Sequence, residues 1–550
     1  MPYRVVDAGT RGRVISPMIQ RDLDARKLPP LFEAGATAEG WTRRRREMLD
    51  LLARGEYGFP PPPPAWVRAE TKREEPRALG GKAVHRELGL TVPAPRGEFS
   101  FPVDLVLPIA DRKAPLVVYI SFTRYPGGFL PVEEIVDSGH AMAVFCYTDV
   151  SEDRDDGFSS SLAGLYDRSG DDGTQWGKIS LWAWAASRVL DHALTLDGID
   201  KDRVFCAGYS RLGKTALWCG ALDERFAGVA SGGSGCSGAA ITRDKKGESA
   251  QAISSRFPHW FCGNYGKYAG REHEMPFDQH MLLAAMAPRP LYLAFASEDE
   301  WADPYSEFLS CVEADKAYRL LGKTGFVHAD RFLEPGESLH EGDIGCHLRP
   351  GTHFFSRYDW RRILGFMDRR LPGGPRLLLR KADGKELPGL RDFLLEIGAG
   401  ENGFGGTAFG RGEGTLEETL TAFADMAAGR NIPKGRVRQI VYWLLDDQGG
   451  VLGMSKLRPQ LTEELLHHGG NIGYYVRPSA RGKGCGRRLL ELTLEEARKA
   501  GLHRVLITMD ADNAASIGTA ESCGGRREDT RVDDKGRAFH RYWIDLDGRA

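Results

Sequence analysis

Short apolar runs alternate with helical segments over the first two thirds of the chain. The apolar runs predict buried strands at 116–121, 141–146, 204–207 and 291–296, and the intervening patterns predict helices at 182–196 and 360–370. Strands of a parallel sheet are covered on both faces, so their sequences are apolar throughout rather than alternating. This pattern predicts an α/β fold with a doubly wound sheet.

Proline and glycine residues at 371–375 end the last of these helices and mark the best domain boundary. We predict an N-terminal domain over 1–372, with 1–60 as a helical lead-in, and a second, smaller α/β domain over 376–550. The strands predicted for the second domain are 439–445, 451–456, 471–476 and 504–509, with a helix that ends near residue 500.

Composition narrows the class of protein. The chain has 550 residues, too many for one hydrophobic core, and its formal net charge of −2 favours neither nucleic acid nor an anionic membrane as partner. No apolar run reaches the ~18–20 residues of a membrane span, and the N-terminus shows no secretory signal. The nine cysteines are scattered and form no C-x-x-C pair, which indicates reduced thiols and no metal site. We therefore expect a cytoplasmic protein.

A candidate nucleophile follows the strand at 204–207, in the sequence Gly208-Tyr209-Ser210-Arg211-Leu212-Gly213-Lys214. A sharp turn between a strand and a helix lifts a serine hydroxyl clear of the sheet and points backbone N–H groups at a developing oxyanion. The spacing Gly-x-Ser-x-x-Gly differs from the usual Gly-x-Ser-x-Gly, so the motif alone is weak. The alternative is that Ser210 only caps the next helix.

A serine nucleophile needs a base, and the base needs an orienting carboxylate, in the chain order serine, acid, histidine. Asp299 follows the strand at 291–296, and His353 lies in a loop before the last helix of the domain. We expect Ser210 to attack the carbonyl, His353 to move the proton and Asp299 to orient His353. The rival residues are Glu298 and Asp303 as acid and His347 as base.

Three further segments, at 223–226, 257–261 and 278–280, together with Gly-x-Ser-Arg-x-Gly-Lys, resemble the glucuronoyl esterases of carbohydrate esterase family 15. The resemblance covers residues 25–372 and is closest to the bacterial branch. It implies hydrolysis of an ester on the carboxyl group of glucuronic acid, as in lignin–xylan linkages, without a cofactor. It also implies that Arg211 stabilises the oxyanion and that Lys214 binds sugar hydroxyls. Trp260 is either a sugar-stacking residue or a core tryptophan.

The chain departs from the family at the position of its usual triad glutamate. Many members carry that acid in a Glu-Ser-Gly stretch, where this chain has Gly233-Ser234-Gly235. Some bacterial relatives place an acid after the later strand, which supports Asp299. Esterases that act on lignocellulose are normally exported, so the natural ester stays open, and an acetyl ester on a sugar is the alternative substrate.

A second motif, Arg481-Gly482-Lys483-Gly484-Cys485-Gly486, lies between the strand at 471–476 and a long helix. Glycines let the backbone approach a pyrophosphate, which N–H groups at a helix start can bind. The region 376–550 resembles the GNAT N-acetyltransferases, which implies acetyl-CoA as donor. The resemblance assigns the pyrophosphate to Arg481, Gly482, Gly484 and Gly486, the pantetheine arm to the backbone of Val476, and a contact near the thioester to Asn513.

Many GNAT proteins have a tyrosine on the helix after the residue equivalent to Asn513, as general acid for the leaving thiolate. The segment 514–523 contains no tyrosine, so protonation of the leaving group stays unassigned. The acceptor amine and its base are open as well. We predict a bifunctional esterase and acetyltransferase; the alternative is a second domain that only binds coenzyme A or a partner and regulates the esterase.

Overall fold

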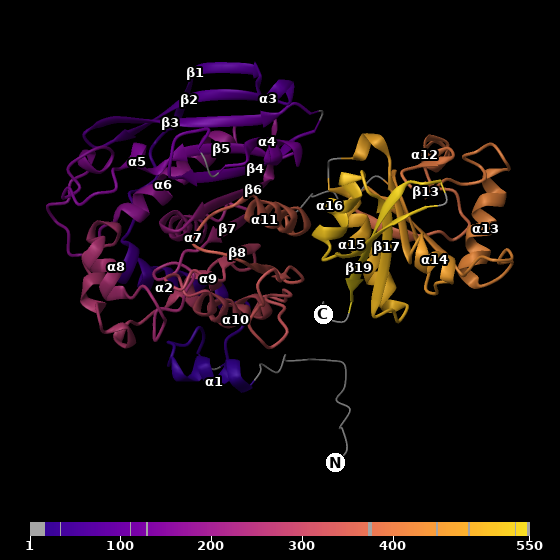
Figure 1. Ribbon diagram of the computed structural model, residues 1–550. Coiled ribbons are helices and arrows are strands. Elements are labelled where there is room, and N and C mark those ends of the chain that lie inside the picture. The colour runs from indigo at the N-terminus through magenta and orange to yellow at the C-terminus, as the bar shows by residue number, and fades with distance from the viewer. Residues whose placement is uncertain are drawn as a thin grey trace, which may run out of the picture. The chain divides into compact units, whose positions relative to one another are not determined.

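The computed structural model describes residues 17–546 except 34, 111, 128–129, 372–376, 447–448, 482–483 and 534. The chain divides into two compact units, Met1–Gly374 and Pro375–Ala550 (Figure 1). The segment 372–375, where a boundary is predicted, lies outside the described residues, as does the start of the predicted lead-in.

The first unit is built on a ten-stranded sheet in the order β1-β2-β3-β5-β4-β6-β7-β8-β10-β9. The strands are β1 (Arg68–Arg77), β2 (Ala83–Ala94), β3 (Gly97–Pro108), β4 (Ala114–Ser121), β5 (Ala141–Cys146), β6 (Ile199–Tyr209), β7 (Gly228–Gly232), β8 (Leu291–Ala296), β9 (Ser338–Leu339) and β10 (Ile344–Arg349). The strands from β5 to β10 in this order run parallel. The carboxyl ends of β6, β8 and β10 therefore lie at one edge of the sheet.

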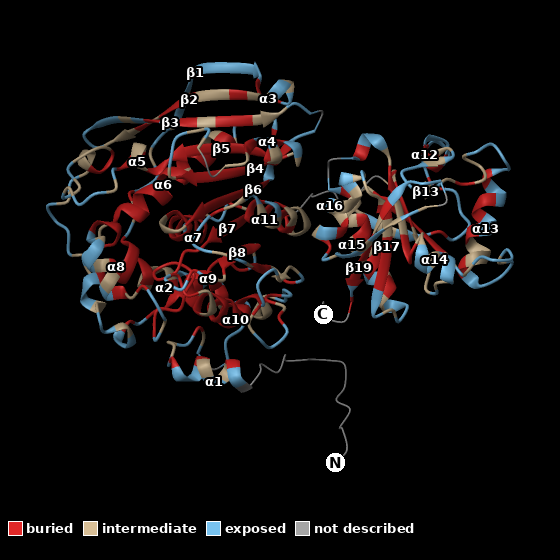
Figure 2. Cartoon of the chain, in the orientation of Figure 1, coloured by how far each residue is buried: buried red, intermediate tan, exposed pale blue. Residues whose placement is uncertain are grey.

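Helices cover both faces of this sheet. They are α1 (Pro17–Ala25), α2 (Trp41–Leu52), α3 (Ala78–Gly81), α4 (Val132–Asp137), α5 (Tyr147–Val150), α6 (Lys178–Ala193), α7 (Arg211–Leu222), α8 (Ala250–Arg256), α9 (Gln279–Ala284), α10 (Pro304–Leu320) and α11 (Arg357–Arg370). One buried cluster includes Trp182 of α6 and Trp218 of α7, and a second includes Ile135 of α4 and Trp360 of α11. Figure 2 shows that the central strands β4 to β8 are largely buried. The predicted α/β fold with a doubly wound sheet is confirmed.

The antiparallel strands β1, β2 and β3 were not predicted from the sequence. β1 reads Arg-Ala-Glu-Thr-Lys-Arg-Glu-Glu-Pro-Arg and is almost wholly exposed at the edge of the sheet. Without an apolar face it has no periodicity to reveal it. Its charges suit an edge position, because they discourage pairing with another chain.

The second unit contains a four-stranded sheet in the order β11-β14-β15-β16 and a three-stranded sheet in the order β17-β19-β18. The strands are β11 (Leu378–Lys381), β14 (Ile440–Leu445), β15 (Val451–Leu457), β16 (Ile472–Val476), β17 (Arg504–Asp510), β18 (Arg526–Val532) and β19 (Ala538–Asp545), with a short hairpin of β12 (Gly400–Glu401) and β13 (Phe404–Gly405). The helices are α12 (Leu390–Ile397), α13 (Leu416–Ala428), α14 (Glu463–His467), α15 (Cys485–Lys499) and α16 (Ala514–Ser522).

The two sheets of the second unit meet where β16 begins. The amide of Asn471 donates to the carbonyl of Leu506 at 2.7 Å, and the amide of Leu506 donates to Oδ1 of Asn471 at 2.8 Å. Beyond this junction β16 and β17 belong to different sheets. The four strands and the long helix predicted for this unit are all present, with ends within one residue of the predicted ones.

Candidate active sites

Ser210 lies directly between β6 and α7, with φ 56° and ψ −128°. A positive φ is uncommon for a residue with a side chain and costs energy. Backbone hydrogen bonds hold this conformation: the amide of Ser210 donates to Gly232 at 2.8 Å, and its carbonyl accepts from Gly213 at 2.8 Å and from Lys214 at 3.1 Å. The turn places the serine at the carboxyl edge of the sheet.

Two glycines allow the chain to close this turn. A Cβ atom on Gly208 would lie 2.0 Å from the carbonyl oxygen of Leu212. A Cβ atom on Gly213 would lie 2.7 Å from the hydroxyl of Ser231 and 3.1 Å from the carbonyl oxygen of Gly232. Close backbone approach therefore requires glycine two residues before and three residues after Ser210, which accounts for the unusual spacing.

His353 and Asp299 form a hydrogen bond, with 2.5 Å between Nδ1 and Oδ2. The His353 ring packs against Tyr209 at 4.8 Å between centroids, and a Cβ atom on Gly233 would lie 3.2 Å from its Cε1. The ring therefore rests on the residue that precedes Ser210 and on the loop after β7. With Nδ1 bound to the carboxylate, Nε2 is the nitrogen left to exchange a proton with a nucleophile.

Two of the three rival residues, Asp303 and His347, have other structural roles. Asp303 caps α10, where its carboxylate accepts from the amide of Ser306 at 3.3 Å and from the amide of Lys246 at 2.8 Å. His347 is fully buried and bonded to Asp359 at 2.8 Å and to the Tyr292 hydroxyl at 2.9 Å. Of the candidate pairs, the structure brings His353 and Asp299 to the serine turn.

The first turn of α7 supplies backbone N–H groups that the helix itself does not use, and the side chain of Arg211 extends from the same turn. The Arg211 guanidinium forms an ion pair with Asp153. Asp153 also accepts hydrogen bonds from Trp260 Nε1 at 2.6 Å and from the Tyr147 hydroxyl at 3.0 Å, and lies 3.0 Å from His259 Nε2. Asp153 therefore fixes the position of the arginine next to the nucleophile.

The contacts of Asp153 with Arg211, Trp260 and His259 stabilise its ionised form. Burial alone would raise the pKa of this carboxyl, but the hydrogen bonds from His259 and Trp260 and the charge of Arg211 outweigh burial and hold the pKa well below its ordinary value. Asp153 was missed in the sequence because it is one of several acids in the loop 152–156, and no periodicity distinguishes it.

Trp260 is buried, with 3% of its surface exposed. Phe257 stacks on its ring at 3.9 Å between centroids, and the Arg211 guanidinium lies 4.7 Å from the ring centroid. With these neighbours on the ring and its N–H bound to Asp153, we expect Trp260 to position Arg211 rather than to stack on a sugar.

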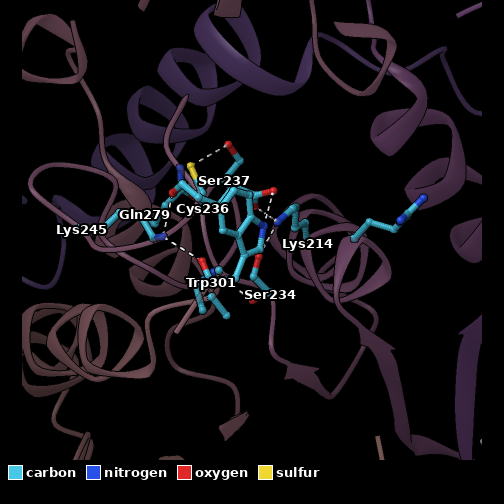
Figure 3. A network of polar contacts seen from close by, with 12 residues as sticks. Lys214, Ser234, Cys236, Ser237, Lys245, Gln279 and Trp301 are labelled. Carbon is cyan, nitrogen blue, oxygen red and sulfur yellow. Dashed lines mark hydrogen bonds and ion pairs between the residues drawn. The ribbon is translucent and has the colours of Figure 1, made fainter. Parts of the chain in front are cut away.

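Lys214 lies one turn further along α7, where its ammonium donates to the carbonyl of Ser234 at 2.5 Å and forms an ion pair with Glu248 at 3.4 Å. The indole N–H of Trp301 donates to the other oxygen of Glu248 at 3.2 Å, while 53% of Trp301 stays exposed. Figure 3 shows Lys214, Ser234 and Trp301 converging. An ammonium, a carboxylate and an exposed aromatic ring together can bind the hydroxyls and one face of a sugar.

Glu248 and Trp301 were not assigned a role from the sequence. Trp301 offered a signal, because it stands in the same loop as Asp299, directly after the strand that carries the acid. Glu248 offered none, since the segment that holds it shows no regular pattern.

Glu307 of α10 is buried beneath the loop that carries Ser234. One of its oxygens accepts from the amide of Gly235 at 2.8 Å and from the Ser234 hydroxyl at 3.3 Å, and the other has no hydrogen-bond partner among the described residues. Burial, with a smaller contribution from Asp299, raises the pKa of Glu307 to about 8. This carboxyl supports the loop on which Lys214 and His353 rest.

In the second unit, α15 begins directly after Gly484, which has φ 74° and no atom within 4 Å of where a Cβ would stand. A Cβ atom on Gly486 would lie 3.7 Å from Thr519 Oγ1, so this position is also open. The open backbone and the unused N–H groups of the first turn of α15 suit a pyrophosphate. The predicted contact Gly482 lies outside the described residues.

The structure brings Arg481 and Val476 together. Arg481 Nε donates to the carbonyl of Val476 at 3.0 Å, and its guanidinium pairs with Glu401. Asn513 caps α16 by accepting from the amide of Ser516 at 3.1 Å. The hydroxyl of Tyr474, on β16, lies 3.5 Å from the Ser516 carbonyl, so a phenol from another element approaches the helix that lacks a tyrosine.

Metal-binding clusters and membrane-spanning helices are both absent from the residues that the structure describes. No group of three or more His, Cys, Asp or Glu side chains among them could hold a metal ion. None of their helices combines the length and apolar character needed to cross a membrane.

The fold and sites define a serine hydrolase of the α/β-hydrolase class joined to an acetyltransferase domain. The family model described as glucuronyl esterase, fungi, matches residues 90–322, and that of the acetyltransferase (GNAT) family matches residues 417–524. Carbohydrate esterase MZ0003, from an unknown prokaryotic organism, is 33% identical over 382 residues, which cover 62% of this chain and 87% of that protein.

Solved structures extend the comparison. A glucuronoyl esterase from Solibacter usitatus is 35% identical with a TM-score of 0.58, and the match covers 62% of this chain and 97% of that one. A CE15 glucuronoyl esterase from Teredinibacter turnerae T7901 is 30% identical with a TM-score of 0.58, covering 63% of this chain and 89% of that one. The chain belongs to carbohydrate esterase family 15 through its first unit, which is fused to a GNAT domain.

Replacement of Asp299 tests the assignment of the acid. We expect Asp299→Asn to lower kcat for ester hydrolysis by about 1,000-fold or more, because the His353 tautomer and its positive charge lose their partner. Asp303→Ala should instead lower the free energy of unfolding by about 1–2 kcal/mol through loss of the helix cap, with kcat nearly unchanged. Steady-state kinetics and denaturant unfolding of both variants check this. A larger loss of kcat in Asp303→Ala would reverse the assignment.

Replacement of Glu307 tests whether its buried carboxyl is protonated in the folded protein. Between its unfolded pKa near 4.5 and its folded pKa of about 8, the folded protein holds a proton that the unfolded chain has lost. This group therefore makes stability fall as pH rises through that window. Glu307→Gln should gain stability relative to wild type by up to about 1.4 kcal/mol per pH unit from pH 5 to pH 8. Denaturant unfolding of both proteins at several pH values measures the difference, and a difference independent of pH would contradict the buried, protonated state.

Proposed function

We propose that the first unit hydrolyses esters on the carboxyl group of glucuronic acid through an acyl-enzyme. The observation that carries the proposal is the 2.5 Å bond between His353 and Asp299 beside the turn that holds Ser210. Ser210 attacks the ester carbonyl while His353 Nε2 accepts its proton, and Asp299 stabilises the charged ring. His353 then donates this proton to the leaving alcohol and later activates the water that releases the acid.

The oxyanion of each tetrahedral intermediate would be stabilised by the backbone N–H groups of α7 and by the Arg211 guanidinium. Asp153 and Trp260 hold this guanidinium in place before the substrate arrives. Donors that are already oriented need no reorganisation when charge develops, which is the main source of electrostatic catalysis.

The sugar would lie against Lys214, Glu248 and Trp301. Lys214 and Glu248 provide a donor and acceptors for ring hydroxyls, and Trp301 provides an exposed aromatic surface. The similar proteins are named as glucuronoyl esterases, which supports a uronic acid as the acyl group.

For the second unit we propose transfer of an acetyl group from acetyl-CoA to an amine. The open backbone at Gly484 and Gly486 would hold the pyrophosphate together with Gly482 and Arg481, the backbone of Val476 would hold the pantetheine arm, and Asn513 would lie near the thioester. When bound, acetyl-CoA supplies an activated acyl group. All nine cysteines are buried and none is part of a disulfide bond, which supports our proposal that the protein works in the cytoplasm.

Hydrolysis of benzyl and methyl glucuronate tests the first proposal. We expect turnover by the purified protein and a loss of at least about 1,000-fold in Ser210→Ala, because the nucleophile is removed. Chromatography of the released glucuronic acid measures the rate. Activity on acetylated xylan but not on glucuronate esters, still dependent on Ser210, would keep the mechanism and contradict the substrate.

Calorimetric titration with acetyl-CoA tests the second proposal. Gly486→Glu should weaken binding at least about 10-fold more than Gly486→Gln, because the two side chains have similar size and only the first repels a pyrophosphate. Thermal unfolding of both variants controls for folding, since a Cβ atom fits at this position. Equal affinity for both variants would place the pyrophosphate elsewhere.

A further inference from the structure

Cationic side chains gather at one edge of the four-stranded sheet in the second unit. Arg436 lies in the segment that leads into β14, and Lys456 and Arg458 lie at the end of β15. β14 and β15 are antiparallel, with Ile440 opposite Leu457, so these two places are adjacent. Arg411, in the loop before α13, acts electrostatically on the same lysine. We call Arg411, Arg436, Lys456 and Arg458 the cationic edge.

The cationic edge has little negative charge around it. Within the part of the chain that the structure describes, Arg411 pairs with Glu413 at 2.7 Å, but no ion pair includes Arg436, Lys456 or Arg458. Arg458 donates instead to Gln439 Oε1 at 3.2 Å and to the carbonyl of Gly470 at 3.0 Å. Grouped cations without counterions repel one another, so the arrangement has an electrostatic cost in the free protein.

Lys456 is the residue on which the other three cations of the edge act. Its ammonium donates to the carbonyl of Gly405 at 2.5 Å and lies 4.3 Å from the centroid of the Phe404 ring. Burial, followed by the charges of Arg458, Arg411 and Arg436, lowers the pKa of Lys456 to about 7. An anion bound here would relieve the repulsion and restore the full charge of the lysine, so the edge favours a negatively charged ligand.

The cationic edge does not coincide with the site expected for the pyrophosphate. Lys456 is the strand partner of Gly473, which lies three residues before Val476 on β16. At about 3.3 Å per residue, that is ~10 Å from the expected position of the pantetheine arm. On β15 the side chain of Lys456 points to the hairpin β12–β13, whereas the neighbouring Leu457 belongs to the core cluster that contains Leu490 of α15. The side chain of Lys456 therefore lies on the opposite face of the sheet from α15.

We propose that the cationic edge binds an anionic group, a carboxylate or a phosphate, on the amine that the second unit acetylates. The inference rests on the proposed acetyl transfer and adds the chemical class of the acceptor. The exposed Arg436 can pair with two oxygens of such a group at once, while Lys456 and Arg458 provide charge from the strand. The acceptor amine would then lie between the anion and the thioester.

Matched pairs of amines test the proposal in the full-length protein. The pairs are glucosamine 6-phosphate with glucosamine, and 4-aminobutyrate with 4-aminobutanol, and release of free thiol from acetyl-CoA measures transfer. We expect the charged member of at least one pair to have a kcat/KM at least about 10-fold higher, and the pair that responds separates phosphate from carboxylate. Lys456→Gln should remove this preference. The control Lys499→Gln, on the exposed end of α15, should keep it.

The remaining outcomes of these experiments either support the proposal or overturn it. A preference for the neutral amines, or an equal loss on both members of a pair in Lys456→Gln, would overturn it. If no amine reacts, phosphate and succinate are titrated into the protein saturated with coenzyme A. Binding that Lys456→Gln abolishes supports the anion site, and no binding by either anion overturns it. Failure to bind acetyl-CoA would contradict the proposed transfer. Phosphate and succinate are then titrated into the protein without coenzyme A, and binding that Lys456→Gln abolishes, or no binding by either anion, still decides this inference.

Discussion

The positive φ of Ser210 is the constraint on which the esterase site depends. It costs about 1–3 kcal/mol in a residue with a side chain, and it persists because the surrounding backbone is bonded to β7 and closed by Gly208 and Gly213. The other groups are placed relative to this turn. Arg211 is the next residue, Lys214 follows one helical turn later, and His353 packs on the preceding tyrosine.

Charge in this site is arranged in buried or half-buried pairs. Asp153 balances Arg211 and Glu248 balances Lys214, so two cations can lie near a reacting carbonyl without being left uncompensated. A pair that loses one member leaves an unpaired charge, which costs several kcal/mol. Asp153 and Glu248 are therefore as necessary to the geometry as the cations, although neither acid needs to touch the reacting atoms.

The sequence predicts those parts of the structure that have a regular apolar pattern or that follow the expected order of serine, acid and histidine along the chain. The strands β4, β5 and β8 are buried along their whole length and mainly apolar, and Ser210, Asp299 and His353 each follow a strand of the sheet. Asp153 and Glu248 could not be predicted, because their partners Arg211 and Lys214 are distant in the chain and their loops show no periodicity. Trp301 could have been predicted only from its place in the loop that carries Asp299. β1 could not be predicted from the sequence, because an exposed, charged edge strand has no apolar face.

In the proposed functions, both units would use the start of a helix to hold negative charge. The oxyanion proposed at α7 would exist only during the reaction, so its donors must be rigid beforehand, and the contacts of Arg211 with Asp153 and Trp260 would supply that rigidity. The pyrophosphate expected at α15 is permanent, so an open backbone at Gly484 is sufficient. Each unit has core clusters of its own, so each proposed site depends on the packing of the unit that holds it.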